Sequence, residues 1–227
     1  PDWAGAVLIG IGLLALWAGL RVVGVPLRAT LILTLIAGLG LAAAAAIYRP
    51  TPQPFAALAA VALIGVWLAG WIARRTPARF GLAALVVLVT FAGVIWPSWL
   101  SDDALISYHY AQNLASGHGL VYNVGERVEG YTNFLWTVLF AGIIALGGDP
   151  VAWNYILGAA LAVAIVMLTY ALGARLRTPA VGLLAALIVA TSQSLLLYTV
   201  RGSGLETGLF TLLVLAGVAR YLTADLR

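Results

Sequence analysis

The sequence has few charges, no lysine and no cysteine. Only 9% of its 227 residues are charged, whereas 63% are hydrophobic, and the mean hydropathy is +1.04. A soluble domain needs about 25% charged residues to cover its surface, so these proportions exclude a soluble core and a disordered chain. They indicate a polytopic membrane protein. The absence of cysteine excludes disulfides and thiolate metal sites. The net charge of +4 comes from arginines at the ends of apolar runs, and no basic cluster of the nucleic-acid-binding type is present.

Seven apolar runs are long enough to cross a bilayer, which takes about 20 residues. We expect each run to be a helix, because backbone polar groups in lipid must be satisfied within the segment itself. The expected spans are 3–20, 29–48, 55–73, 80–96, 151–173, 180–198 and 205–222. The predicted fold class is therefore all-α, a polytopic membrane protein with about seven transmembrane helices.

An eighth apolar run, 131–146, is short and begins with polar residues. If it crossed the membrane, Arg175 and Arg177 would lie outside, against the positive-inside tendency. If it enters the outer interface and returns, both arginines lie inside. We therefore predict a juxtamembrane or re-entrant helix at 131–146, with the loop 97–130 on the outer side.

The stretch from residue 97 to residue 130 concentrates the scarce polar chemistry of the chain. It holds four of the eight acidic residues and both histidines, namely Asp102, Asp103, Glu126, Glu129, His109 and His118. In a membrane protein such a concentration indicates a functional site, although a solvated outer loop is the alternative.

A helix over 102–116 is predicted at the start of this stretch. Ser101 is suited to cap it, Asp102 and Asp103 fall in its first turn, and Gly117 ends it. One acid would offset the helix dipole, so two adjacent acids exceed what capping requires. We expect one stripe of this helix to consist of Leu105, Tyr108, Gln112 and Ala115.

Four motifs in the second half of the chain occur in a characteristic order. Ser-Asp-Asp-Ala-Leu-Ile-Ser-Tyr at 101–108 precedes Ala-Gln-Asn-Leu-Ala-Ser-Gly-His-Gly-Leu-Val-Tyr-Asn at 111–123. Gly-Glu-Arg-Val-Glu-Gly-Tyr-Thr-Asn-Phe-Leu-Trp follows at 125–136, and Ser-Gly-Leu-Glu-Thr at 203–207. Together they resemble membrane glycosyltransferases of the C superfamily (GT-C), of the arabinofuranosyltransferase-like and protein-mannosyltransferase-like group. The resemblance extends over about 80–222.

The resemblance implies the N-terminal part of such an enzyme. Three extra spans would occupy 1–79, and a partial GT-C core would occupy 80–227, with an outer loop at 97–150. Juxtamembrane helices at 102–116 and 131–146 would flank the site. The protein would lie in a bacterial-type inner (plasma) membrane, with its site loop outside.

The implied activity is transfer of a sugar, with inversion, from a polyprenyl-phosphate carrier to an acceptor on the outer face. Asp102 would be the general base on the acceptor hydroxyl and Asp103 the second acid of the pair. Arg201 would supply charge for the phosphate. The full set expected to bind substrate is Tyr108, His109, His118, Glu126, Glu129, Tyr131, Asn133, Arg201 and Glu206.

Metal-ligand spacings and phosphate-cradling glycine loops are both lacking in the sequence. We therefore expect no metal and no cofactor, and a lipid-linked rather than a nucleotide-linked sugar donor. The expected partners are membrane lipid and the polyprenyl-phosphate sugar, with no nucleic acid. A second hypothesis is a catalytically inactive, glycosyltransferase-derived structural subunit that joins other membrane subunits. A transporter is disfavoured, because no acidic residue lies centrally in an expected span.

Overall fold

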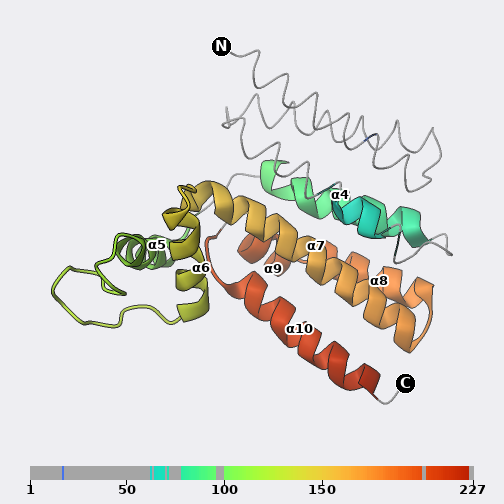
Figure 1. Cartoon of the computed structure of the whole chain (residues 1–227). Coiled ribbons are helices and arrows are strands. Elements are labelled where there is room, and N and C mark those ends of the chain that lie inside the picture. The colour runs from blue at the N-terminus through green and yellow to red at the C-terminus, as the bar shows by residue number, and fades with distance from the viewer. Residues whose placement is uncertain are drawn as a thin grey trace, which may run out of the picture.

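Helix is the only regular secondary structure of the computed structural model within the residues that it describes. These are 78–95, 100–200 and 203–224, with single positions and short stretches at 17, 62, 64–69 and 71. The expected spans at 3–20, 29–48 and 55–73 therefore lie wholly or largely outside the described residues. Figure 1 shows long helices forming a bundle, with two shorter helices, α5 and α6, gathered at one end.

Two described helices are long and apolar enough to cross a membrane. They are α7 (Pro150–Leu176) and α10 (Thr207–Ala224), which confirm the expected helices at 151–173 and 205–222. Helix α4 (Ala78–Ile95) occupies the run expected at 80–96. A third candidate span is a bent pair of helices between α7 and α10.

The prediction of one continuous helix over 180–198 is wrong, because the run is broken in the middle. Helix α8 (Pro179–Ala190) ends at Thr191, and the chain bends by 55° into α9 (Gln193–Leu195) and a π-helical turn, η1 (Leu196–Val200). The Thr191 hydroxyl donates to the Leu187 carbonyl at 2.8 Å, and the Ser192 hydroxyl oxygen accepts from the Leu195 amide at 3.2 Å. Two short polar side chains thus satisfy the backbone groups at the break.

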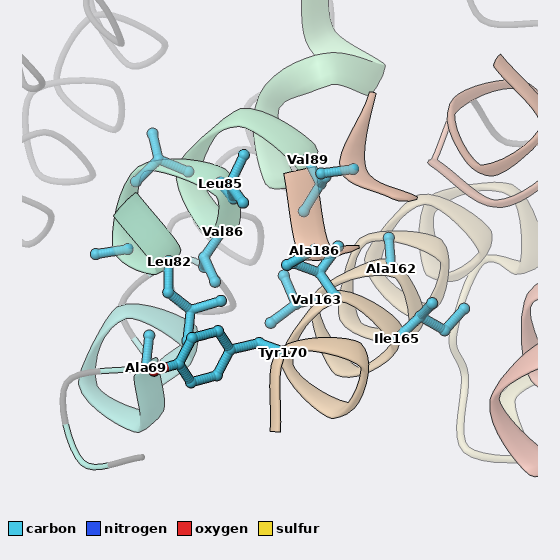
Figure 2. Close-up of a cluster of buried hydrophobic side chains, with 14 of the residues drawn as sticks. Ala69, Leu82, Leu85, Val86, Val89, Ala162, Val163, Ile165, Tyr170 and Ala186 are labelled. Atoms are coloured by element: carbon cyan, nitrogen blue, oxygen red, sulfur yellow. The ribbon is translucent and has the colours of Figure 1, made fainter. Parts of the chain in front are cut away.

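Small and branched side chains form the core of the bundle. Figure 2 shows this cluster, in which Leu82 and Val86 of α4 meet Val163 and Ala186 of α7 and α8. Between α7 and α8, an ideal Cβ on Gly173 would lie 2.8 Å from Gly182 Cα. Close approach of this kind matters in lipid, where packing contacts rather than water exclusion hold helices together.

Helices α5 (Asp102–Ala115) and α6 (Phe134–Ala145) pack on each other at one end of the bundle (Figure 1). At about 1.5 Å per residue, the 12 residues of α6 extend about 18 Å, less than the roughly 30 Å hydrocarbon core. The expected short helix within 131–146 is therefore confirmed. The cap of α5 is confirmed as well, because the Ser101 side chain accepts from the Asp103 amide at 3.2 Å.

The stripe expected along α5 is only partly correct. Tyr108 is buried, but Leu105 is 52% exposed, and Gln112 is exposed too. The buried residues of α5 are Ala104, Ser107, Tyr108, Tyr110 and Ala111. Ala104, Tyr108 and Ala111 pack in one cluster with the large rings of Trp136 and Phe140 on α6.

The chain path brings two distant segments to the same end of the bundle. Helix α7 leads away from α6, α8 returns, and α10 leads away again from the region of α5 and α6 (Figure 1). The segment 203–206, just before α10, therefore lies at the end where α5 and α6 lie. The far end of the bundle carries the turn between α7 and α8.

Candidate active site

A cavity of about 330 Å³ opens where α5, the start of α6 and the start of α10 meet. Its walls contain two carboxylates, Asp103 and Glu206, from segments far apart in the sequence. The complete lining is Asp103, Ile106, Ser107, Gly130, Tyr131, Thr132, Asn133, Leu205 and Glu206. Four predicted site residues thus meet here: Asp103, Tyr131, Asn133 and Glu206.

The two acids of the predicted pair are placed differently. Both acids are exposed, but only Asp103 is among the residues that line the cavity. Adjacent residues on a helix point about 100° apart, so only one of two neighbouring acids can face the same wall. Ser107 lies one turn after Asp103 and lines the same cavity; sequence reasoning missed it, although the spacing of four places it on that face.

Asn133 joins the three segments that form the cavity. Its side-chain amide donates to Glu206 Oε2 at 3.1 Å and to Ser107 Oγ at 2.9 Å. Its side-chain oxygen accepts from the Thr137 hydroxyl at 3.0 Å, and Ser107 donates in turn to the Asp103 carbonyl at 3.0 Å. The Ser107 hydroxyl also lies 3.2 Å from Asn133 Oδ1, which is a second acceptor for its proton. The bond from the Asn133 amide to Glu206 Oε2 holds the Glu206 carboxylate in a defined position.

The segment 203–206 is fixed against α5 and α6 by backbone contacts. The Ser101 amide donates to the Ser203 carbonyl at 3.0 Å, and Trp136 Nε1 donates to the Gly204 carbonyl at 2.9 Å in a buried setting. Gly204 has a φ of +83°, and an ideal Cβ there would overlap Ala104 Cβ and lie 2.8 Å from Leu100 Cδ1. This segment can therefore approach α5 closely only with glycine at position 204.

Tyr108, predicted to bind substrate, lies in the packed cluster between α5 and α6 rather than among the cavity residues. It is 6% exposed, and its ring centroid lies 4.7 Å from that of Phe140. Burial raises the pKa of the Tyr108 phenol strongly, with smaller contributions from Tyr155 and Asp149. Within the described residues the Tyr108 hydroxyl has no hydrogen-bond partner.

A ladder of aromatic rings runs beside the cavity. Ring centroids are separated by 4.5 Å between His109 and Tyr122, 5.6 Å between Tyr122 and Tyr110, and 4.9 Å between Tyr110 and Tyr131. Partial burial raises the pKa of the Tyr131 phenol, and the Glu129 carboxylate adds to the effect. The phenol therefore stays protonated near neutral pH, so it is available as a hydrogen-bond donor.

The remaining predicted residues lie elsewhere on the loop. Glu126 lines a second cavity of about 310 Å³, and His118 and Glu129 line a third of about 380 Å³. Arg201 lies outside the described residues. Within the described ranges, no three or more histidine, aspartate or glutamate side chains gather closely enough to hold a metal ion.

Comparison with known proteins gives local similarity to one kind of enzyme. Over 88 residues the chain is 39% identical to a terminal beta-(1->2)-arabinofuranosyltransferase of Mycobacterium tuberculosis, covering 38% of this chain and 13% of that protein. Over 56 residues it is 45% identical to a terminal beta-(1->2)-arabinofuranosyltransferase of Corynebacterium glutamicum, covering 24% of this chain and 8% of that protein. No protein-family model matches the chain, and no solved structure does.

The chain therefore shares partial, moderate-identity similarity with terminal beta-(1->2)-arabinofuranosyltransferases. The matched stretches span about an eighth, or less, of the length of these relatives.

Proposed function

We propose that the chain is the acceptor-activating part of a membrane glycosyltransferase that uses a polyprenyl-phosphate sugar on the outer face of the membrane. The observation that carries the proposal is the cavity in which Asp103 and Glu206 meet. The local similarity to arabinofuranosyltransferases supports it and suggests arabinofuranose as the transferred sugar.

The proposed reaction needs one base and one anion-binding group. The base removes the proton from an acceptor hydroxyl as its oxygen attacks the anomeric carbon of the donor. The bond from that carbon to the phosphate oxygen breaks, and polyprenyl phosphate leaves with the electron pair, so the anomeric configuration inverts. General-base catalysis typically contributes about 100- to 10,000-fold in rate. We assign the leaving phosphate to Arg201.

The acid pair supplies the base in this proposal, and geometry favours Asp103 over Asp102. Both acids are exposed, but only Asp103 lines the cavity in which Glu206 also lies. The resemblance assigns the base to Asp102, so the two acids make opposite predictions that can be separated.

Glu206 binds the sugar rather than removing the proton. One of its carboxylate oxygens already accepts from Asn133 at 3.1 Å, so the carboxylate has a fixed direction. A carboxylate held in this way accepts hydrogen bonds from sugar hydroxyls, and bonds to a charged group are worth about 1.5–3 kcal/mol each.

The test is a transfer assay with a labelled polyprenyl-phosphate arabinofuranose and a synthetic arabinan acceptor. Asp103→Asn should lower kcat by at least about 100-fold, while Asp102→Asn should lower it much less. Glu206→Gln keeps the shape of the side chain and should mainly raise KM, by about tenfold.

Asp149→Asn is the matched control. Asp149 caps α7, its side chain accepts from the Ala152 amide at 2.9 Å, and it lies outside the cavity. Asparagine also caps helices well, so transfer should be unchanged. Wild-type rates in both Asp103→Asn and Asp102→Asn would remove the acid pair from the mechanism. Absence of transfer by the wild-type protein would favour the structural-subunit hypothesis.

A further inference from the structure

The second cavity adjoins the first and has a different chemistry. The two share Ile106 and Gly130 as lining residues, so they lie next to each other. The second cavity, of about 310 Å³, is lined by the aromatic rings of Tyr110 and Tyr122 and by the polar side chains of Asn123 and Glu126. This volume is at the lower end of the roughly 300–1,000 Å³ typical of small-ligand sites.

The aromatic walls of this cavity are held in place by hydrogen bonds. The Tyr110 hydroxyl donates to the Val128 carbonyl at 2.9 Å and accepts from the Gly130 amide at 2.9 Å. The Tyr122 carbonyl accepts from Asn113 Nδ2 at 2.8 Å and lies 3.0 Å from His109 Nε2. Because three residues of α5 hold the loop, its rings are ordered before any ligand arrives, which lowers the entropic penalty of binding.

The polar groups of the cavity suit hydroxyl groups. Asn123 Nδ2 donates to Glu126 Oε2 at 3.0 Å, while the other carboxylate oxygen of Glu126 makes no hydrogen bond within the described residues. Tyr122 is 43% exposed, so its ring is available for contact. A flat apolar ring beside a carboxylate and an amide matches a sugar, which presents C–H groups on its faces and hydroxyls at its edge.

Other ligands fit this cavity less well. None of its lining residues is basic, so a phosphate would meet the Glu126 carboxylate without a compensating cation. An acyl chain would bury that carboxylate against hydrocarbon, which is costly. These considerations leave an uncharged glycan as the best match.

We propose that this second cavity is the acceptor subsite, which holds the sugar unit preceding the one whose hydroxyl reacts beside Asp103. The inference rests on the proposed function, because it takes the first cavity as the place of transfer. Tyr122 stacks on this sugar unit, and Glu126 accepts hydrogen bonds from its hydroxyls.

The first experiment measures binding to the full chain in lipid nanodiscs, with a synthetic arabinofuranosyl oligosaccharide titrated by calorimetry. Tyr122→Ala and Glu126→Gln should each weaken binding by about tenfold or more. Tyr122→Phe retains the ring and should bind nearly as the wild type does. Tyr221→Ala is the matched control, because Tyr221 is 80% exposed and lies in the last turn of α10, the helix that leads away from α5 and α6 (Figure 1).

The second experiment measures transfer with varied acceptor and varied donor. Tyr122→Ala should raise the acceptor KM by about tenfold while leaving the donor KM unchanged. Normal transfer and normal acceptor binding in both Tyr122→Ala and Glu126→Gln would overturn the subsite while leaving the proposed function intact. Loss of oligosaccharide binding in these variants of a protein that transfers nothing would show that the cavity binds a glycan, but it would overturn the proposed function and with it the acceptor role of the cavity. A wild-type protein that does not bind the oligosaccharide would overturn the subsite.

Discussion

Replacement of Gly204 by alanine should disturb the site strongly, because Gly204 fixes the segment 203–206 against α5. Its φ of +83° lies in the left-handed region, which costs an L-residue about 1–2 kcal/mol. The new Cβ would overlap Ala104 Cβ and would lie 3.0 Å from the Tyr108 hydroxyl. Overpacking of this kind typically costs about 1–3 kcal/mol. The two contributions together predict a loss of about 2–5 kcal/mol for Gly204→Ala.

Gly117→Ala separates the two contributions. Gly117 has nearly the same φ, +81°, but an ideal Cβ there has no neighbour within 4 Å. It should therefore lose only the backbone part, about 1–2 kcal/mol. Thermal unfolding of both variants in the same detergent, with the wild type, measures the difference. Transfer should fall by about 100-fold in Gly204→Ala, because a shift of about 1 Å in Glu206 misplaces the substrate.

Equal losses of stability in Gly204→Ala and Gly117→Ala would refute the reasoning, since they would show that segment 203–206 does not press against α5. A large loss of stability with normal transfer would show that Glu206 keeps its place without the close approach.

Tyr108→Phe should stabilise the protein by about 1 kcal/mol in thermal unfolding. It removes a buried hydroxyl that lacks a hydrogen-bond partner among the described residues. A lower stability of the variant would show that the hydroxyl has a partner in solution. Single cysteines that replace His118 and Arg177 should react with an impermeant maleimide from opposite sides of the membrane, because the two positions lie at opposite ends of the bundle. The cysteine at position 118 should react in intact cells. Reaction of both cysteines from the same side would contradict the predicted topology.

The local features of α5 were predictable because they depend on few neighbours. A serine followed by two acids specifies a helix start through hydrogen bonds within one turn, and the structure confirms the cap at Ser101. The shortness of α6 was readable from the length of its apolar run.

Features that depend on packing were not predictable. The break after α8 was missed because Thr191 and Ser192 hardly lower the hydropathy of a long apolar run, although their hydroxyls satisfy the bend. The buried face of α5 was misjudged because it depends on how α6 packs, and there the rings of Trp136 and Phe140 lie against Ala104, Tyr108 and Ala111 rather than against Leu105. Which of Asp102 and Asp103 faces the cavity also depends on how α5 packs against its neighbours, so it could not be predicted from the sequence.

The hydrogen bond between Asn133 and Glu206 also sets a time order for assembly of the site. The two residues are separated by 73 positions in the sequence. At about 5–20 residues per second, a ribosome therefore adds Glu206 about 4–15 s after Asn133. Throughout that interval α5 and α6 can pair, but the Asn133 amide and Trp136 Nε1 still lack the acceptors that segment 203–206 supplies. The cavity is thus completed only when the start of α10 leaves the insertion machinery, and a nascent chain that stalls earlier holds both acids of the pair without a substrate site.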